Sequence, residues 1–286
     1  MEGMAGGRRK HVASAIKLIV LFLLLLVYMV PFFLILINSL KGGAAILRNP
    51  LQILDPNGVT FDNFKKAFVQ MDFLRAFANS LFVTVISVFF IVLFASMTAY
   101  LFARTSWKLN KIIFACMVAA MIVPFQVIMI PLVSIYGGTL NMLDSHLTLI
   151  FMNIGFGMSM AVFIYHGFVK SNVPVALEEA AMLDGCTRLQ TFFKVVFPLL
   201  RPITATIVVL DVLWIWNDYL LPSLVLSNNK ALFTLPLSTY SFYGTYSVDY
   251  GAIMAALVLT TLPVIVLYIF LQKHIISGVI SGAVKT

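Results

Sequence analysis

The feature that most constrains this chain is a series of six apolar stretches, each long enough to cross a lipid bilayer as a helix. At a rise of about 1.5 Å per residue, about 20 apolar residues span the hydrocarbon core. The sequence is 61% hydrophobic and only 10% charged, which is outside the range of soluble domains. We therefore predict an all-α polytopic membrane protein, a single transmembrane domain over residues 1–286, with spans at Ile16–Asn38, Ala78–Ala103, Ile112–Tyr136, Leu147–Phe168, Pro198–Leu226 and Gly251–Leu271.

Basic residues between the predicted spans set the expected orientation, because Lys and Arg near span ends tend to stay in the cytoplasm. One side of the membrane receives Arg8, Arg9, Lys10, Lys17, Arg104, Lys108, Lys111, Lys170, Arg188, Lys194, Arg201, Lys273 and Lys285. The other side receives only Lys41, Arg48, Lys65, Lys66, Arg75 and Lys230. Both termini, residues 1–15 and 272–286, and the loop 169–197 are therefore predicted to be cytoplasmic, and the segment 39–77 external.

Several function classes lack a sequence signal. The net charge of +8 comes from short clusters rather than one long basic face, so we expect no nucleic-acid partner. The two cysteines and four histidines are scattered and form no catalytic or metal-binding pattern. No phosphate-binding loop of the type that binds ATP occurs. We expect no catalytic site, cofactor or metal in this chain.

The predicted cytoplasmic loop has the local signals of two short helices. Ser171 or Asn172 is expected to cap the first helix, Pro174 suits its first turn, and Gly185 ends it. Thr187 is followed three residues later by glutamine, a capping box that begins the second helix. Such a compact helix suits insertion into a groove of a partner protein.

The spacing within this loop is specific. Glu179-Ala180-Ala181, then three residues, Gly185, nine residues and Val195-Val196-Phe197-Pro198 resembles the EAA loop of bacterial ABC importer permeases. At the end of the motif the family usually has Ile-x-Leu-Pro. This sequence has Val195 and Phe197 at the first and third of those positions, and both are also apolar. The resemblance implies a coupling helix that docks on a cytoplasmic ATPase, with coupling residues Glu178, Glu179, Ala180, Ala181, Asp184, Gly185 and Pro198.

Two further motifs are similar to the carbohydrate-uptake branch of that family and its smaller maltose-type permease subunit: Trp214-x-Trp216-Asn217-Asp218-Tyr219 and Thr234-Leu235-Pro236. The resemblance implies a multi-pass protein of a bacterial or archaeal cell membrane that imports a sugar or oligosaccharide. It implies as partners a second homologous permease, two ATPase subunits that hold ATP and Mg, and an extracytoplasmic solute-binding protein. In relatives, the tail that corresponds to residues 272–286 enters the interface between the ATPase subunits.

Polar residues at membrane depth are candidates for the solute path, because they are costly there unless they face the bundle interior or water. Asp211, Trp214 and Asp218 have the spacing of one helix face. The alternative is that these groups bond to neighbouring helices or to the partner permease. The candidate path residues are Asn153, Asp211, Trp214, Asn217 and Asp218.

An external segment rich in tyrosine and small polar residues precedes the last predicted span. It suits a recognition loop that contacts the binding protein, but tyrosines also form interfacial belts at the headgroups. The candidate contacts are Phe242, Tyr243, Gly244 and Tyr246.

Two other functions stay open at this point. A proton-coupled secondary carrier could titrate Asp211 and Asp218 during alternating access, but it leaves the EAA-like loop unexplained. An ABC permease for a non-sugar solute would share that loop. A membrane enzyme or scaffold has no residue constellation in its favour.

Overall fold

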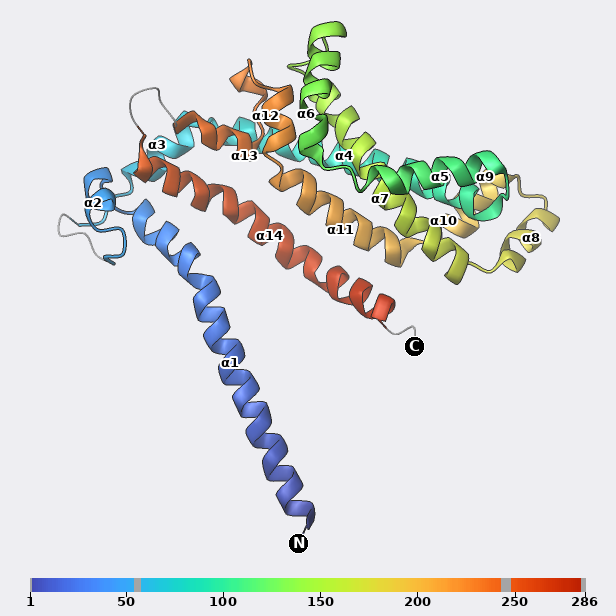
Figure 1. Ribbon diagram of the computed structural model, residues 1–286, viewed down its shortest axis with the longest axis horizontal. Coiled ribbons are helices and arrows are strands. Elements are labelled where there is room, and N and C mark those ends of the chain that lie inside the picture. The colour runs from blue at the N-terminus through green and yellow to red at the C-terminus, as the bar shows by residue number, and fades with distance from the viewer. Residues whose placement is uncertain (1, 54–57, 243–247, 284–286) are drawn as a thin grey trace. The chain divides into compact units, whose positions relative to one another are not determined.

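The computed structural model describes residues 2–53, 58–242 and 248–283, and the side chains of 14–53, 58–242, 248–270 and 272. This described part of the chain is built from helices, with no strand. They are α1 (Glu2–Ser39), α2 (Gly43–Arg48), α3 (Asp62–Gln70), α4 (Phe73–Arg104), α5 (Lys108–Ala120), α6 (Phe125–Val133), the π-helical turn η1 (Ser134–Thr139), α7 (His146–Asn172), α8 (Val175–Leu183), α9 (Arg188–Thr191), the π-helical turn η2 (Phe192–Val196), α10 (Phe197–Leu199), α11 (Arg201–Asn217), α12 (Leu220–Val225), the 3-10 turn η3 (Lys230–Leu232), α13 (Leu235–Ser238), the 3-10 turn η4 (Thr239–Phe242) and α14 (Tyr250–Ala283) (Figure 1). The all-α prediction is confirmed.

The chain packs as two units, residues 1–71 with 241–261, and residues 72–240 with 262–286. In the first unit, Asn63 of α3 donates hydrogen bonds to the carbonyl oxygens of Ser39 (2.9 Å) and Lys41 (2.7 Å). The Lys41 ammonium is itself buried and donates to Asn38 Oδ1 and two backbone carbonyls. These bonds fold the segment after α1 back onto the end of that helix.

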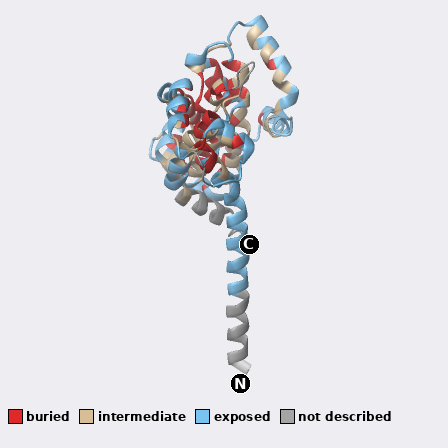
Figure 2. Ribbon diagram, turned by 90° about the vertical axis from the view of Figure 1, so that its left-hand side faces the viewer, coloured by how far each residue is buried: buried red, intermediate tan, exposed pale blue. Residues whose placement is uncertain are grey.

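Helix α1 differs from the rest of its unit, because its side chains from Ser14 to Phe33 are exposed (Figure 2). An apolar helix with no packing partner in its own chain is suited to lipid or to another subunit as its surroundings. The apolar face of α1 is thus available for the membrane.

The second unit is built around α4 and α7, which lie side by side (Figure 1). Their contact buries Ile91, Ala95, Val162 and Tyr165. Small residues let the two backbones approach: a Cβ added at Gly157 would lie 2.6 Å from Ile91 Cδ1. Small residues at helix interfaces are how membrane helices gain close packing.

Four helices of the described chain are long and apolar enough to span a membrane: Ser14–Ser39, Phe73–Arg104, His146–Asn172 and Tyr250–Phe270. Two helix pairs pass the same test only as bent spans, Lys108–Ala120 with Phe125–Thr139 at 100°, and Arg188–Leu199 with Arg201–Asn217 at 77°. By length and composition the number of spans is therefore four to six.

The predicted spans over Ile112–Tyr136 and Pro198–Leu226 are each broken into shorter helices in the structure. The first is interrupted where Pro124 precedes α6, because proline removes a backbone donor and constrains the residue before it. The second begins beyond a bend and stops at Asn217, after which α12 is a separate short helix.

Candidate functional site

The predicted coupling loop forms two short helices, α8 and α9. Gly185 ends the first with φ = +85°, a conformation that favours glycine. The capping box of the second is present: Gln190 N donates to Thr187 Oγ1 at 3.3 Å, and Thr187 N donates to Gln190 Oε1 at 2.8 Å. Both predictions are confirmed.

The expected cap of α8 is wrong. Helix α7 continues through Asn172, so Ser171 Oγ donates back to the Gly167 carbonyl (2.8 Å) and Asn172 Nδ2 to the Phe168 carbonyl (3.2 Å). Short polar side chains inside a helix commonly bond to the carbonyl four residues earlier. Pro174 occupies the cap position of α8 without a side-chain bond.

Helix α8 presents a mostly exposed surface. Leu177 and Met182 are exposed, and Leu183 is 88% exposed. Glu179, Ala180, Asp184 and Gly185 are also exposed, and Ala181 is half-buried. Apolar side chains held in this way on a short helix outside the long spans are a typical partner-binding surface.

Glu178 is the exception in α8, since it is only 3% exposed. Arg104, the last residue of α4, donates to Glu178 Oε1 from Nε (2.8 Å) and Nη2 (2.7 Å), and from Nη2 to the Val173 carbonyl (2.7 Å). The Tyr100 hydroxyl donates to Glu178 Oε2 at 2.9 Å. Glu178 therefore anchors α8 to the end of α4 and is turned away from any partner on the outer surface.

Sequence reasoning missed Arg104 and Tyr100 as members of this site. Each lies one helical turn from the other on α4, and both are far from Glu178 in sequence. Their only sequence signal is a basic residue at the end of a predicted span, on the same predicted side of the membrane as the glutamates of the loop. Pro198 lies in α10, half-buried, just before the 77° bend.

The candidate path residues do not form one face. Asp211 is 9% exposed and its Oδ2 atom has no hydrogen-bond partner in the described chain, and the same holds for Oδ1 of the buried Asn153. Trp214 is instead 42% exposed, and Asn217 bonds back to the Leu213 carbonyl.

Asp218 leaves the predicted face because α11 ends at Asn217. Its backbone is extended, and its Oδ1 accepts from the backbone N–H groups of Leu220 (2.9 Å) and Leu221 (3.4 Å) at the start of α12. Asp218 thus satisfies backbone N–H groups in the first turn of α12 from the position before the N-cap residue, Tyr219. The prediction that it shares a helix face with Asp211 and Trp214 is wrong.

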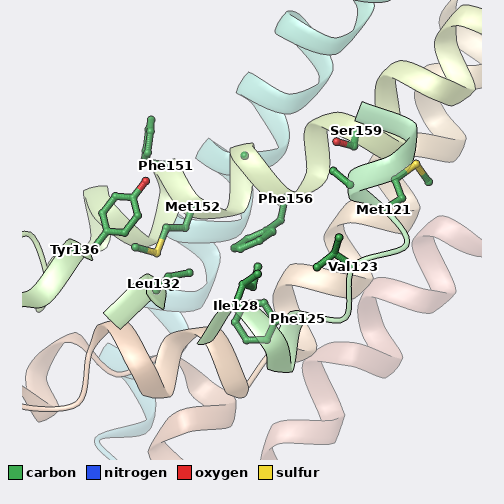
Figure 3. Close-up of a pocket in the computed structure, with 12 residues that line it drawn as sticks. Met121, Val123, Phe125, Ile128, Leu132, Tyr136, Phe151, Met152, Phe156 and Ser159 are labelled. Carbon is green, nitrogen blue, oxygen red and sulfur yellow. The ribbon is translucent and has the colours of Figure 1, made fainter. Parts of the chain in front are cut away.

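A cavity of about 500 Å³ lies where α5 bends into α6 against α7 (Figure 3). Its walls are mostly apolar and aromatic, with Phe125 edge-to-face on Phe156 at a centroid distance of 5.4 Å. Tyr136 and Ser159 contribute the polar groups that Figure 3 labels. The cavity lies at the break between α5 and α6, the two parts of the bent third candidate span.

Phe242 is 2% exposed, so its ring is not on a surface that a binding protein would meet. Tyr243, Gly244 and Tyr246 lie outside the described residues. The chain before them is held on α4, where Asn79 Nδ2 donates to the carbonyls of Ala231 (2.9 Å) and Phe233 (3.0 Å).

Comparison with known proteins gives consistent matches. The family described as "Binding-protein-dependent transport system inner membrane component" matches residues 91–281. The chain is 40% identical over 278 residues to "Probable starch degradation products transport system permease protein AmyC" of Thermoanaerobacterium thermosulfurigenes, covering 97% of this chain and 99% of that protein. It is 36% identical over 258 residues to "Melibiose/raffinose/stachyose import permease protein MelC" of Bacillus subtilis, covering 90% and 92%.

A solved structure has the same fold. The chain aligns with a TM-score of 0.78 and 23% identity, over 93% of this chain and 97% of the other, to a chain from the "Crystal structure of a bacterial ABC transporter involved in the import of the acidic polysaccharide alginate". At this identity the likeness concerns the fold alone.

Proposed function

Because the chain belongs to the family of binding-protein-dependent transport system inner membrane components, we propose that it is the permease subunit of an ATP-driven importer of a sugar or oligosaccharide. The observation that supports this most directly is α8, a short helix with exposed Leu177, Met182 and Leu183. Family membership favours this function over a proton-coupled carrier, which would use no binding protein.

The proposed role of α8 is to dock in a cleft of an ATPase subunit. Its apolar side chains would supply the area buried in the contact with the ATPase. Glu179 and Asp184 would form a charged rim around that contact. The Glu178 to Arg104 pair would pass the motion of α8 to α4, which forms the core of its unit with α7. ATP and Mg would be held by the ATPase chains, and this chain would contribute no catalytic group.

The proposed assembly also includes a second homologous permease and an extracytoplasmic binding protein. In it, residues 169–197 and both termini face the cytoplasm, as the basic residues near the span ends favour. The exposed apolar surface of α1 would meet lipid or the second permease. Asp211 and Asn153, whose buried oxygen atoms lack partners, would face groups of the partner permease, water or solute.

A sugar is the proposed solute class. The named relatives serve "starch degradation products" and "melibiose/raffinose/stachyose". Trp214 has an exposed ring that could stack on a sugar ring, and carboxylate and amide groups on α11 and α7 could accept or donate hydroxyl hydrogen bonds.

The test replaces Leu183, the most exposed apolar residue of α8, in the assembled complex reconstituted in vesicles with its ATPase and binding protein. Leu183→Asp is expected to lose both ATPase retention and ATP-dependent sugar uptake, because a charge would enter the apolar contact. Leu51→Asp makes the same change at an exposed position (72%) in the segment 39–77, and it should retain both.

Undiminished uptake by Leu183→Asp, or uptake that never requires ATP, would contradict the proposal. The solute class is checked separately, by thermal shift of the cognate binding protein with maltotriose, raffinose, stachyose and a panel of amino acids. Stabilisation by an amino acid alone would replace the sugar by another solute and leave the permease role intact.

A further inference from the structure

A second pocket, also of about 500 Å³, lies where three helix ends meet in the second unit. The last residue of α4, the first turns of α5 and the last turns of α7 line it. Because α4 and α7 are two of the long apolar helices, their ends mark the level at which the membrane core gives way to headgroups. The pocket therefore lies at the membrane surface.

The lining of this pocket is basic. Lys111 of α5 and Lys170 of α7 both contribute to it, and no acidic side chain is among the described residues that line it. Arg104 also lines the pocket, but its charge is already paired with Glu178 at 2.7 Å. Within the described chain, neither lysine has an ion-pair partner. Two uncompensated positive charges thus face one concave site.

Hydrogen-bond donors accompany the charges. Ser106 and His166 line the pocket, and Asn110 bonds Thr105 across its edge. The His166 ring lies against Phe114 with centroids 4.3 Å apart, which holds it in place. No side chain caps the start of α5, so the backbone N–H groups of its first turn remain available. Cationic and neutral donors around one hollow match the oxygen atoms of a phosphate group.

The surroundings of the pocket are apolar and exposed. Trp107, Leu109 and Ile112 at the start of α5, and Phe163 on α7, have large exposed fractions. Tryptophan is enriched at the level of lipid headgroups, and the exposed aliphatic side chains beside it in the sequence suit acyl chains. A polar basic hollow bordered by lipid-facing side chains is the arrangement that binds anionic lipid headgroups between transmembrane helices.

We propose that this pocket binds the phosphate group of an anionic ligand, which in the membrane is the headgroup of an anionic phospholipid. Lys111 and Lys170 supply the charge, and Ser106 supplies an uncharged side-chain donor on the connection between α4 and α5. Because Arg104 lines the pocket and also holds Glu178, the occupant sits next to the contact that positions α8. The lipid around the protein would therefore act on the coupling loop.

The test measures phosphatidylglycerol bound to the full chain in detergent by native mass spectrometry, against phosphatidylcholine as the neutral lipid. Lys111→Gln with Lys170→Gln is expected to weaken phosphatidylglycerol binding about 30-fold, given the usual effect of a basic residue at a membrane surface. The matched control, Lys17→Gln with Lys194→Gln, removes the same charge from exposed positions outside the pocket and should leave binding within about twofold.

Two more variants keep the result interpretable if the glutamine pair folds poorly. Lys111→Arg with Lys170→Arg should retain binding, and Ser106→Asp should weaken it by placing a negative charge in the pocket. Inorganic phosphate distinguishes the source: displacement of the lipid at millimolar phosphate identifies the free anion as an occupant, and no displacement identifies the headgroup. Equal phosphatidylglycerol binding by the pocket and control variants would overturn the proposal.

Discussion

Two buried carboxylates in the second unit have opposite surroundings. Glu178 accepts hydrogen bonds on both oxygens, from the guanidinium of Arg104 and from the hydroxyl of Tyr100. Asp211 is also buried, although at 9% it is slightly more exposed than Glu178, and its Oδ2 has no partner among the described residues. A buried charge is tolerated only when it is paired and hydrogen-bonded.

The difference shows which site is complete within one chain. The contact that positions α8 is closed by residues of this chain, so it can form before any partner arrives. The surroundings of Asp211 are incomplete, which is expected of a group that meets a second subunit, water or solute in the assembly. Coupling and translocation thus have different structural requirements.

The largest effect is expected from breaking the paired site. Arg104→Ala leaves Glu178 buried without its cation and the Val173 carbonyl without its donor. We expect the free energy of unfolding to fall by about 3–5 kcal/mol. The change is measured by denaturant unfolding of the full chain in detergent, followed by tryptophan fluorescence. Arg201→Ala, at an exposed position, is the control, and an equal loss there would contradict the pairing.

Removing both charges sharpens the comparison. In Arg104→Met with Glu178→Met, no uncompensated charge remains, so the double variant should be more stable than Arg104→Ala. Tyr100 loses its acceptor, which costs about 1–3 kcal/mol. A double-mutant cycle with the two single methionine variants should give a coupling energy of about 1–3 kcal/mol. Additive effects would mean that the two side chains act independently.

A backbone change tests the loop without touching the ion pair. Gly185→Ala should destabilise the chain by about 1 kcal/mol, because a Cβ is strained at φ = +85°. Gly167→Ala is the control within α7, where an added Cβ meets nothing within 4 Å and helix propensity rises. The same unfolding measurement should give opposite signs for the two variants. A loss at both would show that the loop conformation is not the cause.

The smallest effect is expected at the unpaired carboxylate. Asp211→Asn keeps the shape and removes the charge, and we expect the free energy of unfolding to change by less than about 1 kcal/mol, since no observed bond to Oδ2 is lost. Glu178→Gln makes the same chemical change at the paired site and should cost about 1.5–3 kcal/mol. Comparable losses for the two variants in the isolated chain would remove the distinction between the sites.

Local signals were read well from the sequence. The end of α8 at Gly185 and the capping box of Thr187 and Gln190 depend on residues only a few positions apart. Both could therefore be predicted from a short stretch of sequence. The cap expected at Ser171 or Asn172 failed, because α7 runs farther than the apolar pattern indicated. The bends in the third and fifth candidate spans, 100° and 77°, could not be derived from the sequence, since a bend angle depends on what packs against each proline or break.

The sequence by itself therefore determined that this chain is an all-α membrane protein with an EAA-like loop, because span length, charge and capping are properties of neighbouring residues. Only the tertiary structure decided that Glu178 pairs with Arg104, that Asp211 is left without a partner, that Phe242 is buried and that Lys111 and Lys170 face one pocket. Those outcomes require helices far apart in the sequence to meet at a particular depth and rotation, and packing alone sets both.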